Sequence, residues 1–171
     1  MLLSDILKDV EIIYTNVSRQ EIEINKISTD SRTAELGDIF VCIKGEHADS
    51  HNYIGEAIGN GAAVLITDRE VDGTYIKVAD TRKALAVMCG NYYGRPQDKL
   101  DIIAVTGTNG KTTVTHMLKA IYEEAGYKCV VIGTVTNSMT TPVPEQLYPL
   151  LADYAEAGID YVFMEASSHA L

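Results

Sequence analysis

The sequence is short of basic residues, and this shortage excludes two classes of partner. Lys and Arg together number 14 against 24 Asp and Glu, which gives a formal charge of −10. A surface that binds nucleic acid or anionic lipid needs a positive field to offset the phosphates. We therefore expect neither a nucleic-acid partner nor a membrane partner.

Cysteines and long apolar runs are also scarce. Cys42, Cys89 and Cys129 form an odd, widely spaced set without metal-ligand spacing, which favours reduced thiols and a cytoplasmic protein. No apolar stretch approaches the roughly 18 residues of a membrane span. The first residues also lack the basic region and apolar run of a signal peptide. The whole sequence is 46% hydrophobic and 22% charged, as in a typical globular protein.

The first part of the chain alternates short helix and strand patterns up to a turn. Apolar spacing predicts helices over 2–10, 52–60 and 81–93, and β-rich runs predict strands over 21–27, 39–43, 62–67 and 75–78. Gly94-Arg95-Pro96 then interrupts the pattern. We place the domain boundary just after it, between residues 98 and 99.

The second part repeats a strand, turn and helix rhythm. Strands are predicted over 100–105, 129–135 and 161–165, with helices over 111–125 and 144–157 between them. This alternation predicts crossover units in a parallel sheet. The expected fold is a small mixed α/β domain over residues 1–98. It is followed over 99–171 by the first βαβαβ part of a P-loop ATPase-like parallel-sheet domain.

A glycine-rich turn lies between the strand that ends at Val105 and the next helix. Its glycines let several N–H groups point at one anion, and the helix N-terminus adds a partial positive charge. Lys111 would reach the β- and γ-phosphates, and the Thr112 hydroxyl would ligate Mg²⁺. A surface turn is the alternative, since Val105 occupies the first glycine position of the common motif. The flanking strand and helix favour nucleotide binding by Gly107, Thr108, Asn109, Gly110, Lys111, Thr112 and Thr113.

Two candidate metal ligands follow the last predicted strand. Glu165 and His169 are four residues apart, at a sheet's carboxyl edge, where ligand sites form in α/β proteins. A carboxylate and a neutral imidazole can both face one cation. The alternative is a helix start, with Ser167 or Ser168 as the N-cap and His169 exposed.

Both segments resemble the Mur ligase family. The loop T-G-T-N-G-K-T-T is similar to the ATP loop of these ligases and of their folylpolyglutamate synthetase relatives. The segment E-x-S-S-H-A-L is similar to the one in which Glu and His approach Mg²⁺ ions. The resemblance implies ATP-driven amide formation: a carboxylate is phosphorylated, and an amine attacks the acyl phosphate. It assigns catalytic roles to Lys111, Glu165 and His169 and Mg²⁺ contacts to Thr112, Glu165 and His169.

The first domain carries a further resemblance. Thr29-Asp30-Ser31-Arg32, Gly37-Asp38-Ile39-Phe40-Val41 and the segment from Gly45 to His51 are similar to the uridine-nucleotide domain of the Mur ligases that add the third residue. This implies that Ser31, Glu46, His47 and Ala48 contact the substrate. On the residues alone, Asp30 to Arg32 is a polar turn, and His47 and His51 are plain surface residues. Ser50 stands where glycine is usual in that family.

Thr140-Thr141-Pro142 resembles a family stretch that contacts the muramoyl–peptide part of the substrate. The resemblance adds Thr140, Thr141 and Ser167 to the substrate contacts, although Met139 stands where asparagine is usual. Without the resemblance, Thr141 and Pro142 are typical of a helix start, as N-cap and first helical residue. The two interpretations are compatible.

The resemblance as a whole implies a ligase of peptidoglycan precursor synthesis. It would add an amino acid, with meso-diaminopimelate favoured over lysine, to UDP-N-acetylmuramoyl-L-alanyl-D-glutamate, and we expect a monomer. Two alternatives stay open: a non-catalytic module that binds UDP-sugar and ATP, and a related lysine-adding, dipeptide-adding or folylpolyglutamate-like ligase. We expect one whole domain and about a third of a second. That second part should have an exposed apolar edge and marginal stability.

Overall fold

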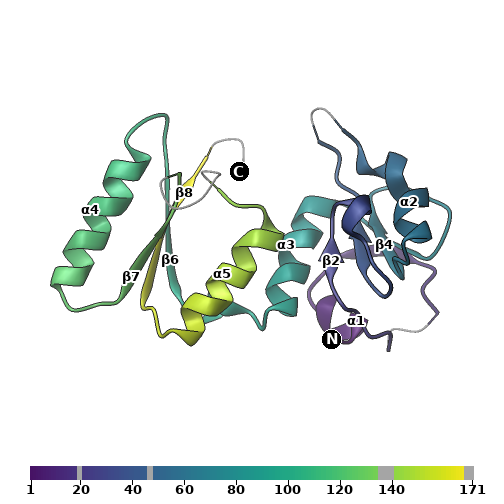
Figure 1. Cartoon of the computed structure of the whole chain (residues 1–171), viewed down its shortest axis with the longest axis horizontal. Coiled ribbons are helices and arrows are strands. Elements are labelled where there is room, and N and C mark those ends of the chain that lie inside the picture. The colour runs from purple at the N-terminus through teal and green to yellow at the C-terminus, as the bar shows by residue number, and fades with distance from the viewer. Residues whose placement is uncertain (19–20, 46–47, 135–140, 168–171) are drawn as a thin grey trace. The chain divides into compact units, whose positions relative to one another are not determined.

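The computed structural model describes residues 1–18, 21–45, 48–134 and 141–167. The chain divides into two compact units, Met1–Tyr92 (unit 1) and Tyr93–Leu171 (unit 2), which Figure 1 shows in sequence colours. The division comes earlier than the boundary that we expect between residues 98 and 99. The short helix η3 (Pro96–Asp98) packs against helix α5 (Pro144–Glu156) and so belongs to unit 2.

Unit 1 is built on a five-stranded sheet in the order β1-β5-β4-β3-β2. The four strands from β2 to β5 pair in parallel, and β1 pairs with β5 antiparallel. The strands are β1 (Ile12–Thr15), β2 (Ile27–Ser28), β3 (Ile39–Val41), β4 (Val64–Thr67) and β5 (Tyr75–Val78). The helices are α1 (Leu3–Ile6), η1 (Ser31–Thr33), η2 (Ser50–Tyr53), α2 (Ile54–Gly59) and α3 (Thr81–Tyr92).

Strands β3 and β4 form the buried centre of unit 1. Every residue of both strands is buried. Side chains alternate between the two faces of a strand, and Phe40 and Leu65 face the side where Ala57 of α2 packs. Helix α3 contacts α1, and Figure 1 shows α2 and α3 on opposite sides of the sheet. Both faces of this sheet are therefore covered.

The prediction of a strand over 21–27 is wrong. Its alternating residues bond instead to the first residues of the chain, since Leu3 N–H donates to Ile22 O and Ile24 N–H to Met1 O, both at 2.8 Å. Only an isolated bridge between Leu2 and Glu23 results, and β2 begins at Ile27. Strand β1, which the sequence analysis does not predict, instead fills the sheet edge beside β5.

Unit 2 has three layers, with a parallel sheet between two helices. The sheet runs β6-β8-β7, and both pairings are parallel, which confirms the predicted sheet type. The elements are β6 (Asp101–Thr106), α4 (Lys111–Glu124), β7 (Cys129–Ile132), α5 (Pro144–Glu156) and β8 (Tyr161–Ala166). Phe163 packs toward Leu118 of α4, whereas Val162 packs toward Leu151 of α5. Figure 1 shows these helices on opposite sides of the sheet.

The carboxyl ends of the three strands in unit 2 meet at one edge. In the register, Val105 pairs with Glu165 and Thr106 with Ala166, and Ile132 pairs with Met164. The segments that follow β6, β7 and β8 therefore all leave the sheet at the same edge. This is the edge at which open parallel sheets form ligand sites.

Candidate functional site

The glycine turn lies at this carboxyl edge, between β6 and α4, as its sequence predicts. Gly107 has φ +149° and Gly110 has φ +81°, conformations that side chains with a Cβ rarely adopt. Gly110 is also the N-cap of α4, and its carbonyl accepts from Val114 N–H at 2.9 Å. The two glycines thus turn the chain from the strand directly into the helix.

The backbone N–H groups of this turn are available to a ligand. From Thr108 to Thr113 they donate to no other residue in the described parts of the chain. Unpaired N–H groups at the start of a 14-residue helix form a site for an anion, because the helix dipole adds to their partial charges. Lys111 Nζ lies over the same turn and donates to Gly107 O at 2.8 Å.

Glu165, the penultimate residue of β8, is the most deeply buried carboxylate at this edge. Its side chain is 1% exposed. Oε2 accepts from the Thr134 hydroxyl at 3.3 Å, whereas Oε1 has no hydrogen-bond partner among the described residues. An unpartnered buried carboxylate oxygen is costly. A cation bound at the sheet edge would satisfy it, and a carboxylate is a ligand that Mg²⁺ prefers.

Gly133, at the end of β7, leaves the space that the Glu165 carboxylate occupies. A Cβ at position 133 would lie 2.2 Å from Oε1 and 2.6 Å from Cδ of Glu165, far inside van der Waals contact. The sequence analysis assigns residues 129–135 to a strand and gives no role to Gly133 or Thr134. Their position in the sequence could have indicated a role in the site, because both residues follow a parallel strand at its carboxyl end, as the glycine turn does.

Thr141 joins the segment before α5 to the end of β8. Its hydroxyl donates to Glu165 O at 3.0 Å and accepts from Ser167 N–H at 3.0 Å. Two of the predicted substrate contacts, Thr141 and Ser167, are thereby brought together beside Glu165. The alternative of a helix start at Thr141 is wrong, because α5 begins at Pro144 with Val143 as its N-cap.

Part of the predicted set lies outside the described residues. These residues are Glu46, His47, Thr140 and His169. Within the ranges that the structure describes, no group of three His, Cys, Asp or Glu residues is placed to hold a metal ion. Thr112 and Glu165 are the two predicted metal ligands whose surroundings are known.

In unit 1, Ser31 opens the short helix η1 and is buried. Its hydroxyl donates to Glu56 Oε2 at 2.5 Å, and its carbonyl accepts from Asn60 Nδ2 at 2.9 Å. The preceding Asp30 caps η1 and pairs with Arg32 at 2.6 Å. This hydrogen bond lowers the pKa of Asp30 to about 2. The Asp30–Arg32 segment is thus a capped helical turn, as the interpretation of these residues as a polar turn predicts.

Ala48 lies in a tight turn after β3. Gly45 N–H donates to Ala48 O at 2.8 Å, and Lys44 and Asp49 form an antiparallel bridge. Helix α2 contacts both η1 and η2, so the Ser31 turn and the segment after Ala48 flank the same helix. Two parts of the predicted nucleotide site therefore share one support.

His51 is buried, which contradicts the interpretation of this residue as a plain surface histidine. Its side chain is 6% exposed. Nδ1 lies 2.5 Å from Asp49 Oδ1, and Nε2 lies 3.2 Å from Asp68 Oδ1 and 3.1 Å from Thr67 Oγ1. The hydrogen bond from His51 is the main cause that lowers the pKa of Asp49 to about 2.

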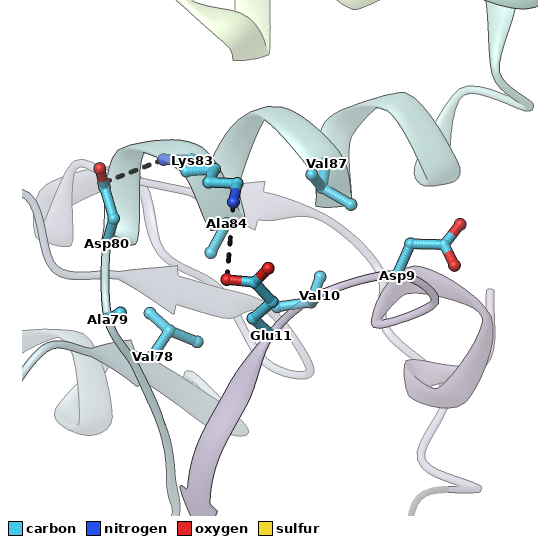
Figure 2. A pocket seen from close by; sticks show the side chains of 9 residues that line it. All are labelled: Asp9, Val10, Glu11, Val78, Ala79, Asp80, Lys83, Ala84 and Val87. Carbon is cyan, nitrogen blue, oxygen red and sulfur yellow. Dashed lines mark hydrogen bonds and ion pairs between the residues drawn. The ribbon is translucent and has the colours of Figure 1, made fainter.

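A hollow of about 140 Å³ also opens in unit 1, at the start of α3 (Figure 2). Its charged groups are already engaged, because Lys83 Nζ pairs with Glu11 at 3.5 Å and Asp80 Oδ1 accepts from the N–H groups of Arg82 and Lys83. Three carboxylates against one lysine repel a diphosphate, so this hollow does not suit a nucleotide. The lining residues are Asp9, Val10, Glu11, Val78, Ala79, Asp80, Lys83, Ala84 and Val87.

Two further features bear on the predicted setting. Cys42, Cys89 and Cys129 are buried and form no disulfide with one another, and burial raises the pKa of the Cys42 thiol to about 12. None of the helices that the structure describes has the length and hydropathy that a membrane crossing requires.

Two family matches cover most of the chain. Residues 105–171 match the Mur ligase middle domain. Residues 23–93 match a family described as Mur ligase family, catalytic domain. One match falls within unit 2 and the other lies almost wholly within unit 1.

Curated relatives match the chain over its whole length. It is 45% identical to the UDP-N-acetylmuramoyl-L-alanyl-D-glutamate–2,6-diaminopimelate ligase of Clostridium perfringens and 44% identical to that of Clostridium botulinum. Each alignment covers 100% of this chain and 38% of the relative. The chain thus spans little more than a third of the length of these enzymes.

Solved structures show the same likeness. A 2,6-diaminopimelate-adding ligase is similar with a TM-score of 0.75 and 29% identity, over 99% of this chain and 36% of that one. The D-alanyl-D-alanyl-adding ligase of Acinetobacter baumannii is similar with a TM-score of 0.67 and 30% identity, over 98% of this chain and 36% of that one. The matches cover both units, and the glycine turn and the buried glutamate at the sheet edge agree with them. The chain therefore belongs to the Mur ligase family.

Proposed function

We propose that this chain supplies the substrate-binding and ATP-binding parts of a ligase of peptidoglycan precursor synthesis. The reaction joins meso-diaminopimelate to UDP-N-acetylmuramoyl-L-alanyl-D-glutamate at the expense of ATP. The observation that carries this proposal is the glycine turn with free N–H groups beside the buried Glu165. The names of the similar enzymes support the choice of substrate and of amino acid.

The turn from Gly107 to Thr113 binds the phosphates of ATP. The N–H groups from Thr108 to Thr113 donate to no acceptor among the described residues, so no hydrogen bond of theirs there must break before they meet an anion. Lys111 must exchange one partner, because its Nζ donates to Gly107 O. Its charge then moves from a neutral carbonyl to a phosphate oxygen, which is the stronger pairing.

Mg²⁺ is held by the Thr112 hydroxyl, Glu165 and His169. When bound, it neutralises charge that develops on the transferred phosphoryl group. Glu165 contributes Oε1, the oxygen without a hydrogen-bond partner among the described residues. Thr134 keeps Oε2 oriented through its hydroxyl. The carboxylate is therefore fixed before the ion arrives.

Ser31, Glu46, His47 and Ala48 bind the uridine nucleotide, and Thr140, Thr141 and Ser167 bind the muramoyl–peptide part. Thr141 offers little hydrogen-bonding capacity to substrate, because its hydroxyl already bonds to Glu165 O and Ser167 N–H. We assign it the task of holding Ser167 next to Glu165. The protein works as a monomer in the cytoplasm, and its three buried cysteines, which form no disulfide with one another, fit that reducing compartment.

The phosphate role of the turn is tested by Lys111→Ala. Titration with ATP and Mg²⁺ should show binding to the parent chain and a loss of at least about tenfold in the variant, since a charged hydrogen bond contributes roughly 1.5–3 kcal/mol. Lys119→Ala is the matched control, because Lys119 lies on the same helix and pairs with Glu123 at 3.6 Å. Equal ATP affinity of the Lys111 variant and the control would overturn the role.

A second measurement separates the ligase from a binding module. The chain is titrated with UDP-N-acetylmuramoyl-L-alanyl-D-glutamate, and ADP release is then followed with ATP, Mg²⁺ and diaminopimelate or lysine. Repeated turnover with diaminopimelate supports ligation by this chain. Binding without ADP release identifies it as a binding module, and absence of binding contradicts the proposed substrate.

A further inference from the structure

The turn that carries Ala48 is fixed at its base by the side chain of Ser50. Ser50 closes the base, since its hydroxyl accepts from Ile43 N–H at 2.6 Å and donates to Ile43 O at 2.9 Å, and its N–H bonds to the same carbonyl at 3.1 Å. The glycine that is usual at this position could not make the two side-chain bonds. The turn is thus anchored to the end of β3.

A second anchor runs to the end of β4. The His51 ring lies between Asp49, in the turn, and Asp68 with Thr67, at the carboxyl end of β4. We name the five residues Asp49, His51, Thr67, Asp68 and Arg69 the His51 clamp. Thr67 is fully buried, and the His51 side chain is 6% exposed, so the ring connects the turn to the rigid centre of the sheet.

The clamp also pairs the acidic groups next to the turn. Arg69 reaches Asp49 Oδ2 at 3.1 Å and Asp68 Oδ1 at 2.9 Å. An unpaired carboxylate at position 49 would repel a diphosphate bound beside Gly45 and Ala48. In the structure both carboxylates have cationic or hydrogen-bonding partners, so neither presents an unpaired charge beside the turn.

We propose that His51 is a positioning residue: it holds the peptide groups of Gly45 and Ala48 in the conformation that the uridine nucleotide contacts. This inference rests on the proposed function of unit 1. The ring does not touch the nucleotide; it acts through Asp49, whose side chain also accepts from His51 N–H at 3.1 Å. Loss of the ring leaves the Asp49 side chain with Arg69 as its partner and removes the second of the two anchors of the turn.

The test compares His51→Gln with His116→Gln in the full chain, because His116 lies exposed on α4 in unit 2. Calorimetric titration uses UDP-N-acetylmuramoyl-L-alanyl-D-glutamate as the ligand. We expect His116→Gln to bind as the parent chain does and His51→Gln to bind about tenfold or more weakly, as loss of buried hydrogen bonds implies. Hydrogen exchange at Gly45 N–H should accelerate while Phe40 in β3 stays protected.

The outcomes separate the inference from the proposed function. If the parent chain does not bind the nucleotide, the proposed function fails and the inference with it. If the parent and His51→Gln bind equally, only the positioning role is overturned. Weaker binding with unchanged exchange at Gly45 overturns it as well.

A second variant covers the case in which His51→Gln unfolds unit 1. Asp68→Asn keeps the shape of the side chain and removes its charge from the Nε2 side of the ring. It should weaken nucleotide binding in the same direction but by less, with Phe40 protected. Unchanged affinity of Asp68→Asn in a chain whose His51→Gln variant does not fold would overturn the proposal.

Discussion

The centre of unit 1 and the edge of unit 2 use similar apolar patterns to different effect. Every residue of β3 and β4 is buried, and helices cover both faces of their sheet. In β6, by contrast, half of the residues are exposed. On α4, which packs beside it, Val114, Met117 and Ile121 are 42%, 59% and 61% exposed.

The difference teaches that periodicity predicts an element but not what covers it. Val114, Met117, Leu118 and Ile121 recur at helical spacing, and the helix forms where they predict it. Among them Leu118 packs on the sheet, next to Phe163, while the other three face outward. This exposed apolar face lies on a helix, so the expected apolar edge of the sheet in the second part of the chain stays a prediction.

The largest test of this comparison is a pair of core truncations. Phe40→Ala in unit 1 and Phe163→Ala in unit 2 each remove a ring that is fully buried, which should cost about 3–5 kcal/mol of unfolding free energy. We expect Phe163→Ala to unfold unit 2 while β3 and β4 keep their protection, because unit 2 has less buried surface in reserve. Hydrogen exchange resolved by segment measures both.

Two results would break the comparison. If Phe163→Ala leaves β8 as protected as β4, then unit 2 has the greater reserve of stability. If it exposes β4 together with β8, the two units unfold as one cooperative body and their cores cannot be ranked separately.

The next effect concerns one glycine at the edge of unit 2. Gly133→Ala places a Cβ 2.2 Å from Glu165 Oε1, so the carboxylate must leave its position. We expect Mg²⁺-dependent ATP binding to weaken by about tenfold or more, as loss of a metal-orienting contact does. Gly59→Ala in α2 is the control, since no atom lies within 4 Å of the Cβ that it would add. Equal ATP affinities of the two variants would refute a role for Gly133.

The sequence predicts the parts of the site that depend on local chain geometry. The glycine turn could be placed because strand, glycines and helix are consecutive, and the structure has them in that order. Gly133 and His51 could not be placed, because their importance comes from partners far along the chain. Glu165 lies 32 residues after Gly133, and the contact from His51 to Thr67 spans 16 residues.

The same reasoning explains why the strand predicted over 21–27 is absent and why β1 is not predicted. Residues 21–27 alternate as a strand does, yet their backbone groups pair with Met1 and Leu3. Strand β1 lies at a sheet edge and has three exposed residues out of four. Its sequence therefore lacks the alternation of apolar and polar residues that a half-buried strand shows. Pairing partners decide both cases, and a single sequence does not reveal them.

A smaller effect concerns acid stability in unit 1. Asp49 has its pKa lowered from 3.8 to about 2, chiefly by the hydrogen bond from His51. A lowered pKa stabilises the folded state above pH 3.8, and this contribution disappears as the pH falls through about 2. The free energy of unfolding of the parent chain should therefore exceed that of Asp49→Asn near pH 6, and the difference should shrink between pH 4 and pH 2. Urea unfolding of unit 1 at each pH measures it, and a constant difference would contradict the lowered pKa.

The smallest effect is expected on the outward face of α4. Met117→Ala should change the free energy of unfolding by no more than about 0.5 kcal/mol, as exposed substitutions usually do. The neighbouring Leu118→Ala should cost about 2 kcal/mol, because Leu118 packs against the cluster of Cys129, Val131 and Phe163. Thermal unfolding of both variants compares two adjacent apolar residues of one helix. Equal costs would mean that the outward face of α4 is covered in solution, and the contrast between the two units would then lie in β6 alone.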